Sequence, residues 1–151
     1  MRRITISALI SAWGLLAALA STAVAAPEED PIRQAVIAAR FDPFDKAAGD
    51  GWEPAFPTPF YRLAGTGQPD AVPLALTPGA YMVVVLCNCE TMDVSLVAPG
   101  GSTVAPSRTN DQGAMYSLDV AAPGDFLTGV DMNDCEDKAC DFAVKVYRKK
   151  S

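Results

Sequence analysis

The chain has 151 residues, of which 50% are apolar and 20% charged, and its formal net charge is −6. This composition excludes an intrinsically disordered protein, and the length suits one folded domain. Histidine is absent from the sequence, which removes the commonest general base and the imidazole metal ligand. The acidic excess argues against nucleic-acid binding, which requires a basic surface.

Residues 1–25 are predicted to be a secretory signal peptide. Two arginines follow Met1, an uncharged run extends over residues 4–20, and the small residues Ala23 and Ala25 suit cleavage after Ala25. A retained membrane anchor is the alternative, because the uncharged run approaches the length of a transmembrane helix. We expect cleavage, a mature chain without a membrane span, and a periplasmic or secreted location.

Residues 26–59 are expected to form a short helix and an irregular linker. In the helix, expected over residues 28–41, Asp30 is suited to the N-cap and Pro31 to the first helical position. Four apolar residues recur at helical spacing and predict the face that covers the core. They are Ile32, Ala35, Val36 and Ala39.

Proline and glycine punctuate residues 42–59, which predicts irregular structure there. Aromatic residues are interleaved with them, and aromatic side chains in such segments usually pin a long loop to the core. A binding surface is the alternative interpretation. Its candidate residues are Trp52 and Phe56.

From residue 60 onward, short runs of β-forming residues alternate with turns. The run 80–86 is continuously apolar, which predicts a strand covered on both faces, and a polar turn is expected at 110–113. The spacing predicts an all-β domain over residues 60–151: an antiparallel, jelly-roll-like β-sandwich of about eight strands. The expected strands span residues 60–64, 72–76, 80–86, 92–97, 103–105, 115–120, 126–132 and 142–147.

Four cysteines in an exported chain predict two disulfides. They are Cys87, Cys89, Cys135 and Cys140. The local pairing Cys87–Cys89 with Cys135–Cys140 is the simplest, but it requires a tight turn at Asn88, and cross-pairing between the two cysteine segments stays open. A four-thiolate zinc site and a redox-active C-x-C pair are less favoured alternatives, because the spacings and the neighbouring charges do not suit them.

The two cysteine segments repeat one pattern, in which a Pro-Gly turn leads into a strand, an acidic cysteine segment and a second strand. We expect each copy to be a hairpin, with both cysteine loops at one end of the domain. Carboxylates gathered there are candidate ligands for calcium, although no calcium-binding motif is present. The candidate residues are Glu90, Asp93, Asp134 and Asp141, with Glu136 and Asp137 nearby.

Residues 60–148 also carry a pattern typical of a known protein family. The pattern consists of Gly79-x-Tyr81 before an apolar strand, the Cys/Asp segment, and Gly124-x-Phe126 before a second cysteine segment. They resemble bacterial pre-peptidase C-terminal (PPC)-like domains. That resemblance implies a secreted jelly-roll sandwich, linked to secretion or to substrate binding and sometimes to calcium. We expect no catalytic domain to be attached to this chain.

No nucleophile or acid–base motif stands out in the sequence, so we expect no catalytic residues and no enzymatic activity. The expected function is a non-catalytic exported module that binds an envelope protein or glycan through its loops. An accessory or regulatory partner of a secreted peptidase is the alternative.

Overall fold

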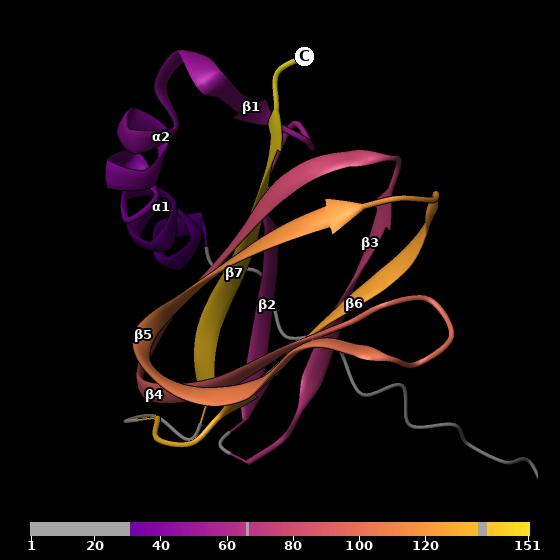
Figure 1. The fold of residues 1–151 in the computed structure, drawn as a ribbon. Helices are drawn as coiled ribbons and strands as arrows, with labels where there is room; N and C mark the ends of the chain where they lie inside the picture. The colour runs from indigo at the N-terminus through magenta and orange to yellow at the C-terminus, as the bar shows by residue number, and fades with distance from the viewer. Residues whose placement is uncertain (1–30, 66, 136–138) are drawn as a thin grey trace, which may run out of the picture.

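The computed structural model describes residues 31–65, 67–135 and 139–151, so the expected signal peptide lies outside the described residues. Two short helices precede an antiparallel β-sheet (Figure 1). The elements are α1 (Pro31–Ala39), α2 (Asp42–Ala48), the 3-10 turn η1 (Gly49–Gly51), β1 (Trp52–Pro54), β2 (Phe60–Gly65), β3 (Asp70–Leu76), β4 (Gly79–Val97), β5 (Thr103–Val120), β6 (Gly124–Met132) and β7 (Ala139–Lys149).

All seven strands belong to one antiparallel sheet, in the order β1-β7-β4-β6-β3, with β2 paired to β7 and β5 paired to β4. The sheet curls so strongly that the β4–β5 hairpin wraps around its open side (Figure 1). The prediction of an antiparallel β fold is confirmed. The prediction of two separate sandwich sheets is not, because β4 is long enough to belong to both halves of a single curled sheet.

Strand β4 changes its neighbour halfway along its length. Residues 81–87 of β4 pair with β7, whereas residues 92–97 pair with β6, and β5 follows the opposite edge through both halves. The chain between these halves keeps its direction and bends. The expected strands 80–86 and 92–97 are therefore one strand, and the turn expected at 110–113 lies inside β5.

The concave side of the sheet holds the main core. Alternation along β4 places Val83 and Val85 in this core before the bend and Val94 and Leu96 after it. The residues of β4 that point into the core have odd numbers before the bend and even numbers after it, because the irregular stretch at the bend shifts the two-residue period of the strand. Each half of the strand thus keeps its apolar residues on the concave side.

The convex side of β4 and β7 is covered by α1 and α2 (Figure 1). Val84 and Leu86 face this side, so the expectation that run 80–86 is covered on both faces is confirmed. The predicted contact face of the helix was wrong, since Ile32 is 73% exposed and Val36 60% exposed, while Ile37 is buried. Hydrophobic periodicity identified an apolar face that points away from the sheet.

Residues 42–59 are more regular than expected, since they contain α2, η1 and β1. Pro43 lies in the first turn of α2, where its missing N–H costs no hydrogen bond, so Asp42-Pro43 starts a second helix. Within the described ranges, no helix has the length and apolar character needed to cross a membrane.

Candidate functional site

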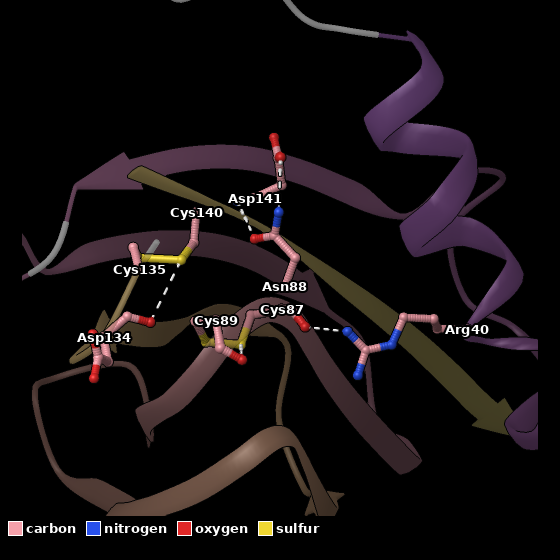
Figure 2. The surroundings of a disulfide bond; sticks show 8 residues. All are labelled: Arg40, Cys87, Asn88, Cys89, Asp134, Cys135, Cys140 and Asp141. Carbon is pink, nitrogen blue, oxygen red and sulfur yellow. Dashed lines mark hydrogen bonds between the residues drawn. A yellow bond between two sulfur atoms is a disulfide. The ribbon is translucent and has the colours of Figure 1, made fainter. Parts of the chain in front are cut away.

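The two disulfides meet where the curled sheet turns its corner (Figure 2). We define the corner as residues 87–91 of β4 together with residues 132–135 and 139–141 of the segment joining β6 to β7. Both β6 and β7 pair with the same edge of β4 and run in the same direction. The corner is therefore the place where two neighbouring chains bend together.

The first disulfide joins Cys87 to Cys89 inside β4. The two Cα atoms are 5.3 Å apart, whereas residues i and i+2 of a regular strand are about 6.6 Å apart. The backbone is therefore contracted around Asn88. The expected tight turn is a bulge within a continuous strand, and the pairing with β5 shifts register between Leu86 and Thr91.

The second disulfide joins Cys135 to Cys140, whose Cα atoms are 5.5 Å apart. Nine residues, 133–141, separate the paired positions Met132 and Phe142, whereas four residues, 88–91, lie opposite them on β4. The segment between β6 and β7 is therefore an insertion relative to the part of β4 that it faces. The disulfide ties the base of this insertion to the start of β7.

Hydrogen bonds join the two cysteine segments directly. The Glu90 N–H donates to the Asp134 carbonyl at 3.1 Å, and the Asn133 N–H donates to the Thr91 carbonyl at 3.1 Å. These bonds continue the ladder between β4 and β6 into the corner. Asn133 and Asp134 are therefore held against the bulge at a fixed position.

The side chain of Asn88 completes the connection (Figure 2). Its Oδ1 accepts a hydrogen bond from the Asp141 backbone N–H at 2.7 Å, and its Nδ2 donates to Asp141 Oδ2 at 3.4 Å. Asn88 thus replaces the backbone pairing that the bulge interrupts between β4 and β7. An amide suits this position because it offers both a donor and an acceptor.

Helix α1 and the turn that follows it contact the corner from the convex side. The Arg40 guanidinium donates to the Cys87 carbonyl, and Arg33 lies 3.5 Å from the Asp141 carboxylate (Figure 2 shows Arg40). The sequence placed Asn88 in the turn between Cys87 and Cys89 but did not identify its partner, and it did not identify these arginines as corner residues. Their partners are about 50 residues or more away in sequence, so no local pattern contains them.

The structure places three of the four calcium candidates in the corner and the fourth, Asp93, beside it on β4. Glu90 and Asp134 are exposed, Asp141 contacts Arg33 and Asn88, and Asp93 lies on β4 opposite Asp131. Across the described part of the chain, no three Asp, Glu or Cys side chains are arranged to hold a metal ion. Calcium binding stays a prediction from the sequence, and the nearby acidic residues 136 and 137 lie outside the described residues.

Trp52 and Phe56, the candidate binding aromatics, are half-buried away from the corner. Trp52 packs against the helix-covered core, and Phe56 packs against the main core with its ring 5.1 Å from that of Phe60. These contacts match the packing role that we favoured for the aromatic residues of the linker.

The repeated sequence pattern corresponds to a real structural relation, but not to two hairpins. In the first copy the chain continues through the bend of β4, and in the second it continues from β6 into β7. The hairpin prediction was wrong because a cysteine-bearing bulge has the composition of a turn. Both cysteine segments nevertheless lie at one place, as expected.

No model of a protein family matches the sequence, and no curated protein matches it. Among solved structures, the chain is similar to PliG of Aeromonas hydrophila, a periplasmic inhibitor of g-type lysozyme, with 14% identity, a TM-score of 0.43, and coverage of 65% of this chain and 86% of that one. It is also similar to a de novo designed double-stranded β-helix, with 11% identity, a TM-score of 0.37, and coverage of 59% and 97%. Similarities of this size assign no family, and the resemblance to PPC-like domains is not shown.

Proposed function

We propose that this protein is a non-catalytic exported module that binds its partner through the corner. The observation that carries the proposal is the convergence of two disulfides, with both cysteine segments hydrogen-bonded to each other. A surface held in this way loses little conformational entropy on binding, which favours recognition.

The exposed groups of the corner define the chemistry of the partner. Asn88, Glu90, Asn133 and Asp134 are exposed there, and they offer carboxylate and amide oxygens. The chain as a whole is acidic, so its long-range field attracts a basic partner. A cationic envelope protein fits these groups best, because carboxylates on a rigid surface give charge-assisted hydrogen bonds to Lys and Arg.

An oxidising compartment is part of the proposal. Disulfides persist in the periplasm and outside the cell, and reducing conditions in the cytosol remove them. The predicted signal peptide supports the same location.

The test is a capture experiment from envelope extract with the purified mature protein. We compare the wild type with a corner variant, Glu90→Gln/Asp134→Asn, and with a control variant of equal charge, Asp50→Asn/Asp125→Asn. The control residues are exposed on η1 and at the start of β6, the end of that strand opposite the corner.

We expect the wild type and the control to capture the same basic protein, and the corner variant to lose it. Equal capture by all three proteins would contradict the proposal. A hydrolase screen tests the absence of catalysis, since turnover that a single carboxylate substitution abolishes would show an enzyme instead.

A further inference from the structure

The convex face of β4 and β7 is an apolar surface under a cover of short helices. Val84, Leu86, Ala143 and Tyr147 are buried in a cluster that is separate from the main core. Their burial depends on α1, α2 and the residues between them, with Trp52 and Tyr61 also packed against the cluster, because the strands direct these side chains away from the concave side. We call residues 31–48 the cover.

The cover contacts this face through residues four positions apart in sequence, which lie on α1, in the turn that follows it and on α2. Ile37 and Phe41 enter the apolar cluster. Asp45, four residues further and on α2, accepts hydrogen bonds from Lys145 Nζ at 2.6 Å and from the Tyr147 hydroxyl at 2.8 Å. The same Lys145 ammonium lies 5.6 Å from the centre of the Phe41 ring, within the range of a cation–π contact.

The cover has the features of a segment that separates from the sheet without unfolding it. Its helices have nine and seven residues, lengths at which helices are unstable in isolation and depend on docking. It connects to β1 through Gly49-Asp50-Gly51, and Gly49 adopts a φ of +51°, a conformation that glycine accepts at little cost. The Asp45 side chain is 41% exposed, so water reaches the polar contact.

We propose that the convex face of β4 and β7 is a binding surface for an amphipathic helical segment of a partner protein, and that the cover occupies this surface as an intramolecular substitute. The partner segment carries two apolar residues four positions apart, followed four positions later by a carboxylate, and like the cover it turns between two short helices at the second apolar residue. These groups take the places of Ile37, Phe41 and Asp45. Helix-in-groove recognition commonly uses anchors with this spacing.

This surface is distinct from the corner, although the cover contacts both. Arg33 and Arg40 reach Asp141 and the Cys87 carbonyl, so a partner that displaces the cover also removes two contacts from the convex side of the corner. The proposal stands on the cover and the sheet face alone, and the binding of a basic partner at the corner is tested separately.

The first test is hydrogen–deuterium exchange on the purified protein, comparing the wild type with Asp45→Asn. Asp42→Asn is the matched control, because Asp42 is an exposed acid of the same helix without a contact to Lys145 or Tyr147. We expect residues 31–48 to exchange before the amides of β4 and β7, and Asp45→Asn to accelerate that exchange about tenfold, since it removes a charge-assisted hydrogen bond. Exchange of residues 31–48 only together with the whole sheet, in every variant, would overturn the proposal.

The second test adds the cover in trans. A fluorescent peptide with the sequence of residues 31–51 is titrated into the wild type and into Asp45→Asn, and its binding is measured by anisotropy. We expect saturable binding to Asp45→Asn that is about tenfold tighter than to the wild type, because the weakened cover competes less. A peptide that itself carries Asp45→Asn should bind about tenfold more weakly than the unchanged peptide. If the unchanged peptide fails to bind Asp45→Asn, the convex face is not a binding surface; if both peptides bind it equally, the acidic anchor is wrong.

Discussion

The two disulfides lie at one corner but in contrasting surroundings. Cys87 and Cys89 are buried within a continuous strand, whereas Cys135 is half-buried at the base of an insertion. The first disulfide lies at the bulge where β4 changes its neighbour, and the second closes the longer segment between β6 and β7. One residue type thus shapes a strand in one case and restrains a loop in the other.

The largest expected effect follows from removing the buried disulfide. Cys87→Ala/Cys89→Ala should lower the free energy of unfolding by about 3 kcal/mol, measured by urea denaturation. Roughly half of this loss comes from chain entropy, even for so short a loop, and the rest from the packing of two buried side chains. A loss below about 1 kcal/mol would show that the bulge forms without the disulfide.

Removing the second disulfide should have an effect of similar size but different origin. Cys135→Ala/Cys140→Ala should cost about 3 kcal/mol, of which roughly two-thirds is loop entropy, because this disulfide closes a longer loop and only Cys140 is fully buried. The same denaturation experiment measures this loss. A loss below about 1 kcal/mol would show that the segment between the two cysteines is restrained without the disulfide.

Asn88 provides the next smaller effect, because its side chain makes both hydrogen bonds to Asp141. Asn88→Ala should cost about 1 kcal/mol and should increase amide exchange at Asp141. Asn133→Ala is the matched control, since Asn133 joins the corner through its backbone N–H. Equal losses for the two variants would indicate that Asn88 does not connect the strands.

The smallest expected effect is a change in the pH dependence of stability, and it comes from Asp45 in the cover and not from the corner. Partial burial alone would raise the pKa of Asp45, but hydrogen bonds from Lys145 and Tyr147 and the charge of Lys145 outweigh it and lower that pKa. The stability that Asp45 contributes is therefore present above its unfolded-state pKa, and it is lost as pH falls below about 4 through the lowered folded-state value. Urea denaturation across this range should show a weaker pH dependence for Asp45→Asn than for the wild type, and identical profiles would contradict the assignment.

Tyr147 gives stability a pH dependence of the opposite sign, and it acts at high pH. Burial first, and then the hydrogen bond and negative charge of Asp45, raise the pKa of the Tyr147 hydroxyl. Its contribution is therefore complete below pH 10 and is lost as pH rises toward the raised folded-state pKa. Tyr147→Phe should remove this alkaline loss in the same measurement.

Much of the sheet was predictable from the sequence, because local patterns specify local structure. The apolar run at 80–86 and the alternation at 92–97 identified both halves of β4, and the recurring cysteine pattern brought the two acidic segments to one place. The continuity of β4 was not predictable, since Cys87-Asn88-Cys89 has the composition of a turn and only pairing with three other strands shows that it is a bend.

The helical cover shows a second limit of sequence patterns. Ile32 and Val36 formed the stronger apolar stripe, yet the sheet accepts Ile37 and Phe41. Polar contacts favour the face that carries Ile37 and Phe41. Arg33 contacts Asp141, Arg40 contacts the Cys87 carbonyl, and Asp45 contacts Lys145. Such partners are distant in sequence, so hydrophobic periodicity, which is a local pattern, does not predict these contacts.

Disulfide mapping by mass spectrometry of an unreduced tryptic digest tests the arrangement of the corner most directly. Cleavage after Arg62, Arg108 and Lys138 places Cys87 and Cys89 on one peptide and separates Cys135 from Cys140. We expect an internally bridged peptide 63–108 and a linked pair, 109–138 with 139–145. Peptide 63–108 joined to either of the others would show cross-pairing and would contradict the corner described above.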